Sequence, residues 1–229
     1  MKISILTLFP EMFTGPFDSS IIKRARENKL VDIKFINIRS FGIGKHKQVD
    51  DTTYGVGNGM VLRVDVLQKA IEKSKIKKLG KSEQKIILLG AHGKTFNQSL
   101  AENFSKLKHL IIICGHYEGF DERIKKFIDE EISIGDFIVT GGEIPAMLIT
   151  DSVSRLVKGV IKKGSAEAES FSPYLEYPQY TKPISYKSLS VPKILLSGNH
   201  AKIKDWREEQ SLKTTAKLRP DLLKKIKKD

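Results

Sequence analysis

The feature that most constrains this chain is a series of short apolar runs that alternate with amphipathic stretches. The runs have the length of strands and almost no polar alternation, which is typical of strands covered on both faces. Strands are expected over residues 3–9, 33–38, 86–89, 110–113 and 137–139. Helices are expected over residues 20–28, 64–75, 97–107, 121–128 and 145–157. The pattern predicts an α/β fold built on a parallel sheet.

The pattern changes after residue 161. Residues 162–179 contain Gly, Ser, Pro and Glu without helical or strand periodicity, so we interpret them as a flexible interdomain linker. Helical character returns from residue 191, and Pro220 is expected to open a last short helix. We therefore predict an α/β domain over 1–161, the linker over 162–179, and a small α-helical C-terminal domain over 180–229.

Charge gives the first indication of a partner. The chain has 40 Lys and Arg against 27 Asp and Glu, a formal net charge of +13, and a sequence pI of about 9.6. Residues 182–229 hold 13 basic and 5 acidic residues, a net charge of +8. Basic charge concentrated in this way is typical of a module that contacts nucleic acid. The alternative is a solvated helical face.

The single cysteine, Cys114, excludes a disulfide within one chain and follows three isoleucines, so we expect it in the core. Such cysteine usage suits a reducing cytoplasm. No apolar run approaches the ~20 residues of a membrane-spanning helix, and the Met1 end lacks a basic-then-apolar leader. We expect a cytoplasmic protein with no membrane partner.

Glycine-rich loops lie at the ends of three of the expected strands: residues 89–93 and 114–119 each follow a strand, and residues 134–143 include the glycines on both sides of the strand expected over 137–139. Open α/β sheets bind their ligands at such strand ends. Glycine there lets backbone amides and carbonyls approach a ligand closely. Any one loop could be an ordinary turn, but three on successive strands predict a shared pocket.

A fourth glycine cluster, at residues 54–60, has the spacing G-x-G-x-G-M. This spacing matches neither the dinucleotide fingerprint nor the Walker loop, so hydride transfer and nucleotide hydrolysis are disfavoured. The five histidines show no paired ligand spacing, and with one cysteine they predict no protein-built zinc site. Each histidine is expected on the surface or in a loop, and we predict no metal-ligating residues.

Seven segments, in their order and spacing, resemble the bacterial tRNA (guanine-N(1)-)-methyltransferases, and the resemblance runs nearly end to end. The segments are 9–13 (FPEMF), 49–60 (VDD leading into YGVGNGM), 115–123 (GHYEGFDER), 133–136 (SIGD), 141–143 (GGE), 196–200 (LSGNH) and 206–207 (WR). The resemblance implies the SPOUT class, whose parallel-sheet α/β domain contains a deep trefoil knot near its C-terminal end. It also implies a homodimer.

The resemblance further implies that the knot loops hold S-adenosylmethionine in a bent shape, mostly through backbone hydrogen bonds. The corresponding positions are Leu89, Gly90, Gly93, Gly115, Tyr117, Glu118, Ile134, Gly135, Asp136, Phe137, Ile138, Val139, Gly141, Gly142 and Pro145. Glu118 corresponds to a carboxylate near the sulfonium of the cofactor. Dependence on Mg²⁺ is also implied, although no magnesium ligands can be identified in the sequence.

The implied reaction is methylation of N1 of guanine 37 in tRNA, where it follows guanine 36. By correspondence Glu169 is the general base, and Arg155 is the cation that stabilises negative charge on O6. Without the resemblance they would be interpreted as a solvated linker glutamate and a helix-surface arginine. The basic C-terminal domain is expected to bind tRNA, and DNA is not an expected partner.

The sequence departs from the family pattern at the proposed base, where Asp-Ser-Phe is usual and this chain has Glu169-Ser170-Phe171. The carboxylate is kept, but its reach grows by one methylene, and Glu167 is close enough in sequence to be a rival. The other departures, which affect loop shape, are Thr53, Val56, Ala91 and His92. The second hypothesis is therefore a catalytically silent RNA-binding protein of the same fold.

Overall fold

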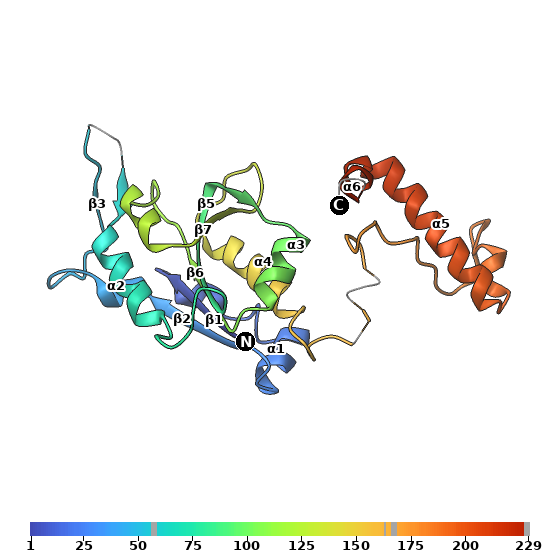
Figure 1. Ribbon diagram of the computed structural model, residues 1–229, viewed down its shortest axis with the longest axis horizontal. Helices are drawn as coiled ribbons and strands as arrows, with labels where there is room; N and C mark the ends of the chain where they lie inside the picture. The colour runs from blue at the N-terminus through green and yellow to red at the C-terminus, as the bar shows by residue number, and fades with distance from the viewer. Residues whose placement is uncertain (56–58, 163, 166–168, 227–229) are drawn as a thin grey trace. The chain divides into compact units, whose positions relative to one another are not determined.

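The computed structural model describes every residue except 56–58, 163, 166–168 and 227–229. The chain divides into two compact units, Met1–Ile161 and Lys162–Asp229 (Figure 1). The first unit contains the large sheet, and the second contains the long helix α5 (His200–Leu218).

A five-stranded sheet in the order β2-β1-β6-β5-β7 forms the centre of the first unit, and every neighbouring pair is parallel. Its strands are β1 (Lys2–Thr7), β2 (Asp32–Asn37), β5 (Gln84–Thr95), β6 (His109–Ile113) and β7 (Glu130–Ser133). The predicted α/β fold with a parallel sheet is confirmed.

Both faces of the sheet are covered, which explains why the strands lack polar alternation. In β6, Leu110 and Ile112 belong to one core cluster, whereas Ile111 and Ile113 belong to the other. The first cluster is covered by α1 (Ser20–Glu27), α3 (Gln98–Ser105), α4 (Glu143–Ser154) and the 3-10 helix η1 (Pro10–Phe13). The second is covered by α2 (Val64–Ser74) and the 3-10 helices η2 (Ile38–Phe41) and η3 (Glu122–Phe127).

A two-stranded antiparallel hairpin, β3 (Asp50–Thr52) with β4 (Met60–Leu62), precedes α2. Leu62 joins it to the loop after β6, because its amide donates to the Gly119 carbonyl at 2.9 Å and its carbonyl accepts from the Asp121 amide at 3.0 Å. The hairpin therefore supports one side of that loop.

The strand predicted over 137–139 is wrong. Phe137 and Ile138 lie in an exposed loop, with 57% and 86% of their surface accessible. The strand is β7, which the pattern missed because it contains two glutamates, and Glu130 forms an ion pair with Lys85 of β5. Pairing of this charge within the sheet allows a polar sequence to occupy an edge strand.

Two helix predictions also need correction. The helix expected over 121–128 is the short 3-10 helix η3, in which only Ile124 is buried and Asp121 accepts the Arg123 amide at 3.0 Å. One buried residue provides too little apolar contact to extend an α-helix. Helix α4 begins at Glu143, so Pro145 stands third, still within the first turn, where an amide has no helical partner.

Strand β5 continues past the predicted end at Leu89. Leu89 and Lys94 both pair with Ile132, so residues 90–93 bulge out of the ladder. A Cβ on Gly93 would lie 2.4 Å from the backbone carbonyl carbon of Glu131. Glycine is needed there because β7 passes directly beside it.

The position of His109 contradicts the prediction for the histidines. His109 is fully buried in β6, whereas every histidine was expected on the surface or in a loop. Its Nε2 lies 2.9 Å from Ser4 Oγ and its Nδ1 lies 2.8 Å from Gln84 Oε1. Burial, together with the nearby charge of Lys2, lowers the pKa of His109 to about 4. Cys114 is buried, as predicted.

The second unit is mainly helical. Its elements are β8 (Ser185–Tyr186), β9 (Leu189–Ser190), the 3-10 helix η5 (Lys193–Leu196), α5 and α6 (Pro220–Ile226). Pro220 opens the last helix, as predicted. No described helix of the chain is long and apolar enough to cross a membrane.

Residues 162–179 belong to this second unit. The Leu175 amide donates to Thr215 Oγ1 at 2.9 Å, and Ser211 Oγ donates to the Leu175 carbonyl at 2.5 Å. The Arg207 guanidinium lies over the Tyr177 ring, 4.8 Å from its centroid. The second half of the segment is thus anchored on α5, and the predicted flexibility of 162–179 stays a prediction.

Candidate active site

A cavity of about 340 Å³ lies beside the bulge of β5 and the carboxyl ends of β6 and β7. The three glycine-rich loops that were expected to share a pocket all contribute to its wall. Parallel strands bring their carboxyl ends to one edge of the sheet, so loops distant in sequence meet there.

Thirteen of the fifteen positions predicted to contact the cofactor line this cavity. They are Leu89, Gly90, Gly115, Tyr117, Glu118, Ile134, Gly135, Phe137, Ile138, Val139, Gly141, Gly142 and Pro145. Gly93 and Asp136 are outside the lining: Gly93 packs against the β7 backbone, and Asp136 is exposed. Lys125 and Glu131 also line the cavity and lie outside the three predicted loops, whereas His116 lies within the second loop but was not singled out.

Close backbone contact joins two walls of the cavity at Gly142. Its amide donates to the Gly115 carbonyl at 2.8 Å. A Cβ on Gly142 would lie 2.5 Å from the Gly115 nitrogen and 2.6 Å from Cys114 Cα. Because these neighbours are backbone atoms, only glycine permits the approach.

The first residue of α4, Glu143, directly follows Gly142 and has a buried carboxylate. Glu143 is 2% exposed, and its Oε1 accepts a hydrogen bond from Thr7 Oγ1 at 2.7 Å. Thr7 Oγ1 in turn accepts the Phe9 amide at 2.9 Å. A carboxylate in the first turn of a helix is stabilised by the helix dipole. Burial and the charge of Glu143 raise the pKa of Cys114 well above its usual value.

His116 lines the cavity, and one of its ring nitrogens is an unsatisfied polar atom. Its Nδ1 is buried and has no hydrogen-bond partner among the described residues. The ring packs edge-on against Phe9 and Tyr117, with centroid distances of 4.9 and 4.8 Å. Buried polar atoms are rarely left unpaired, so His116 is the lining residue whose ring has an unused hydrogen-bonding atom.

Four acidic residues against one lysine give the cavity acidic character: Glu118, Asp121, Glu122 and Glu131 line it together with Lys125. Glu131 is largely buried, with Oε2 3.4 Å from Lys125 Nζ and Oε1 3.9 Å from His92 Nδ1. Glu118 is exposed, and its amide donates to the Met60 carbonyl at 3.0 Å, which ties it to β4. Carboxylates at these positions favour a ligand that carries positive charge.

The two predicted catalytic residues belong to different units. Arg155 is half-buried at the C-terminal end of α4, where its amide donates to the Asp151 carbonyl at 3.1 Å. Glu169 is half-buried in the second unit. The rival base, Glu167, lies outside the described residues.

Among the described residues, no group of three or more His, Cys, Asp or Glu side chains is arranged to hold a metal ion. The magnesium that the family resemblance implies is not assigned to particular residues, because one or two carboxylates with waters can hold it. Magnesium therefore enters none of the steps proposed below.

The fold and the cavity together define an α/β ligand-binding protein whose site is built from glycine-rich strand ends. The family model for tRNA (Guanine-1)-methyltransferase TrmD matches residues 1–225. The chain therefore belongs to the tRNA (guanine-1)-methyltransferase family, as its motifs predicted.

Three relatives named tRNA (guanine-N(1)-)-methyltransferase illustrate the similarity. The protein of Carboxydothermus hydrogenoformans is 55% identical over 227 residues, which cover 98% of this chain and 88% of the relative. That of Clostridium beijerinckii is 53% identical over 228 residues, covering 99% and 93%. That of Dictyoglomus turgidum is 52% identical over 227 residues, covering 98% and 91%.

Proposed function

We propose that this protein transfers the methyl group of S-adenosylmethionine to N1 of guanine 37 in tRNA, where that base follows guanine 36. The observation that carries the proposal is the glycine-lined cavity, whose walls contain thirteen of the fifteen positions expected to contact the cofactor. The names of the relatives support the reaction and the RNA substrate.

The cavity suits the cofactor in size and chemistry. Its volume lies at the lower end of the ~300–1,000 Å³ typical of small-molecule sites. Gly115 and Gly142 bring backbone groups to the wall, and the lining residue His116 has an unpaired ring nitrogen. Glu118 would lie near the sulfonium. When bound, the cofactor supplies an electrophilic methyl group on a positively charged sulfur.

Methylation at N1 requires a base, because N1 of neutral guanine carries a proton and has no free lone pair. The Glu169 carboxylate removes this proton as the N1–methyl bond forms, and negative charge moves toward O6. The Arg155 guanidinium donates hydrogen bonds to O6 and stabilises that charge. The same bond formation breaks the bond between the methyl group and sulfur, so atoms and charge balance.

The active assembly in this proposal is a homodimer of SPOUT subunits, in which the cavity loops form part of a deep trefoil knot. The cavity of one subunit receives Glu169 and the C-terminal domain of the other. Residues 162–179 become ordered when tRNA binds, and the basic region 180–229 contacts the tRNA. We expect the enzyme to act in the cytoplasm.

Methyl transfer to an unmodified tRNA transcript tests the assignment of the residues. Glu169→Gln should lower kcat by about 10²–10⁴, and Arg155→Ala by about 10²–10³, because each removes one transition-state interaction. Calorimetry should show unchanged binding of S-adenosylmethionine in both variants.

Glu167→Gln is the matched control, because it makes the same chemical change two residues away and should leave kcat unaltered. If Glu167→Gln abolishes turnover and Glu169→Gln does not, the base is misassigned. If the wild-type protein binds tRNA but transfers no methyl group, the silent RNA-binding alternative is correct.

A further inference from the structure

The positive charge of the chain lies in two blocks, of which the proposed function uses only the C-terminal one. Residues 69–81 contain six lysines and one glutamate, a net charge of +5. Residues 182–229 carry +8, so these two blocks account for the whole net charge of +13. The remainder of the chain balances, with 21 basic and 21 acidic residues.

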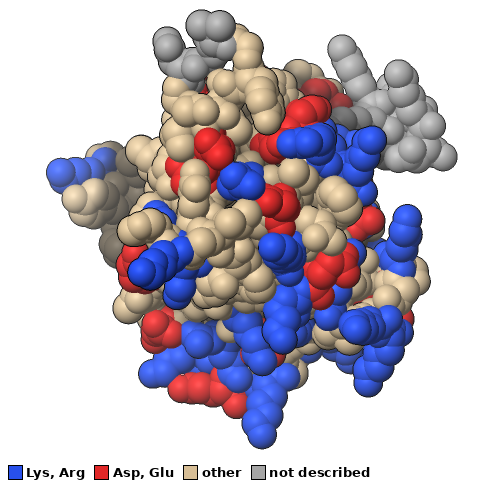
Figure 2. Space-filling model, turned by 90° about the vertical axis from the view of Figure 1, so that its left-hand side faces the viewer, with Lys and Arg blue, Asp and Glu red and all other residues tan. Residues whose placement is uncertain are grey.

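Five of the six lysines are exposed, and we call them the lysine patch: Lys69, Lys73, Lys77, Lys78 and Lys81. Lys69 and Lys73 lie on α2, and the other three follow its end. In Figure 2 the side that carries α2 faces the viewer, and Lys and Arg side chains crowd its lower part.

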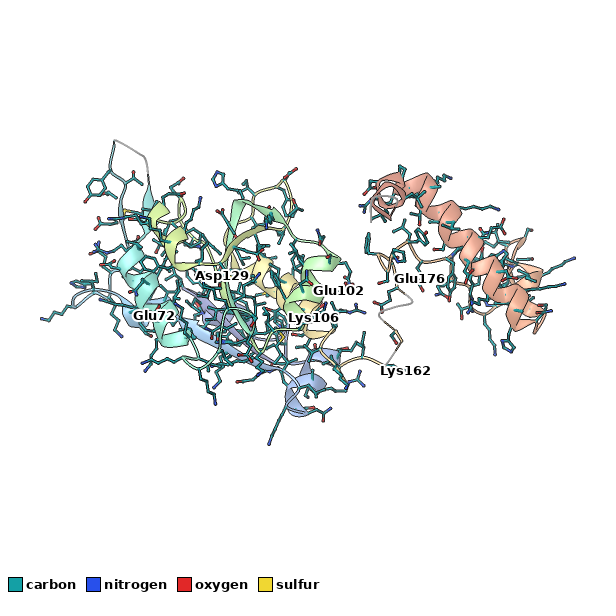
Figure 3. The ribbon with its side chains drawn as sticks, viewed as in Figure 1. Glu72, Glu102, Lys106, Asp129, Lys162 and Glu176 are labelled. Atoms are coloured by element: carbon teal, nitrogen blue, oxygen red, sulfur yellow. The ribbon has the colours of Figure 1, made fainter. Side chains whose placement is uncertain are left out.

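No acidic side chain of the described chain forms an ion pair with any member of the lysine patch. The one acid in the stretch, Glu72 (labelled in Figure 3), pairs with the sixth lysine, Lys75, at 2.6 Å. The patch therefore presents uncompensated positive charge to solvent, which favours a polyanionic partner.

Local stability does not explain the patch. The core-facing side of α2 is formed by Val66, Leu67, Ala70 and Ile71, all fully buried, so the lysines are not needed for packing. Lys73, in the last turn, gains a little from the helix dipole, but the effect falls off within that turn. Lysines beyond the helix gain nothing from it.

Helix α2 connects the lysine patch to the cavity. It starts at Val64, just after Leu62, whose backbone bonds to Gly119 and Asp121 in the cavity wall. Its 11 residues place the other end about 16 Å away, at 1.5 Å per residue. We propose that the lysine patch binds backbone phosphates of the same tRNA whose guanine enters the cavity.

This inference rests on the proposed tRNA substrate and adds a second RNA-binding surface, on the methyltransferase unit itself. Binding to phosphates releases counterions, so affinity depends on salt in proportion to the number of phosphates neutralised. The salt dependence of affinity therefore measures the contribution of the patch directly.

The test compares tRNA binding by the full-length wild type with that of the triple variant Lys73→Gln, Lys77→Gln, Lys78→Gln. The slope of log affinity against log salt should become shallower by about 2–3, roughly one per lysine. The tRNA Kd at low salt should rise by about tenfold. Binding of S-adenosylmethionine should not change, since the three lysines lie outside the cavity wall.

The matched control is Lys23→Gln, Lys29→Gln, Lys34→Gln, which removes the same charge from exposed lysines of α1, the turn after it and β2. Two of these already lie near acids: Lys23 is 3.9 Å from Glu27 and Lys34 is 3.8 Å from Asp32. The control should keep the wild-type slope.

Equal slopes for the two variants would overturn the inference. So would an unchanged tRNA slope accompanied by lost binding to vesicles of anionic phospholipid, which would assign the patch to a membrane surface. These outcomes are independent of the proposed reaction, because they are read from binding and not from turnover.

Discussion

Gly142→Ala tests whether the backbone contact between two walls of the cavity is as tight as the structure indicates. The added Cβ would meet Gly115 N at 2.5 Å, Cys114 Cα at 2.6 Å and the Cys114 carbonyl carbon at 2.9 Å. Ordinary contacts need about 3.5–4.0 Å, so one wall must move by about 1 Å. Such a shift stretches the 2.8 Å hydrogen bond from the Gly142 amide to the Gly115 carbonyl beyond bonding range.

Overpacking costs about 1–3 kcal/mol and the lost hydrogen bond about 0.5–1.5 kcal/mol, which together give roughly 2–4 kcal/mol. This free energy is lost partly from the stability of the fold and partly from the binding of the cofactor. Calorimetry with S-adenosylmethionine and urea unfolding measure the two parts, and a loss of about 2 kcal/mol in binding alone would raise Kd by about thirtyfold.

Gly80→Ala is the matched control, because a Cβ on Gly80 meets nothing within 4 Å and its φ is not positive. It should change stability and binding by no more than about 0.5 kcal/mol. Wild-type binding together with wild-type stability in Gly142→Ala would refute the reasoning.

Two further predictions concern the buried histidine and the segment after residue 161. Because burial depresses the pKa of His109 to about 4, the unfolded state binds more protons between pH 6.5 and 4. The contribution of His109 to stability is therefore present above pH 6.5 and is lost, on the order of 3 kcal/mol, as pH falls toward 4. In urea unfolding, the free energy of unfolding should depend less on pH for His109→Gln than for the wild type. An unaltered pH dependence would show that His109 is not its cause. Amide hydrogen exchange of residues 162–179 should slow when tRNA binds. Strong protection of these same residues in the protein without tRNA would contradict ordering by tRNA.

The sheet could be predicted from the sequence where burial dominates the pattern. Strand β6 consists of His109 followed by four apolar residues with both faces in the core, so its run of isoleucines indicated a covered strand directly. Strand β7 could not be found in this way, because Glu130 depends on a partner, Lys85, that is 45 residues away. Pairing between distant residues leaves no local periodicity.

The same distinction holds for the site: local signals could be recognised in the sequence, and features that depend on distant residues could not. Glycine at a strand end is a local signal, and it located the loop around Gly115, which follows β6. Gly142 also lines the cavity, but it was assigned to the end of a strand over 137–139 that does not form. The unpaired Nδ1 of His116 and the buried Glu143 depend on which loops meet in space, so neither role could be read from spacing. The bulge at residues 90–93 likewise depends on the register between β5 and β7.

The most direct test of the central claim is to locate the methyl group on the RNA. The purified protein is incubated with S-adenosylmethionine labelled in the methyl group and an unmodified tRNA transcript, and the digested RNA is then analysed by mass spectrometry. We predict one 1-methylguanine, at position 37, and none in a transcript with adenine at that position. Label at another atom or another nucleotide, or no transfer by a folded protein that binds the cofactor, would contradict the account.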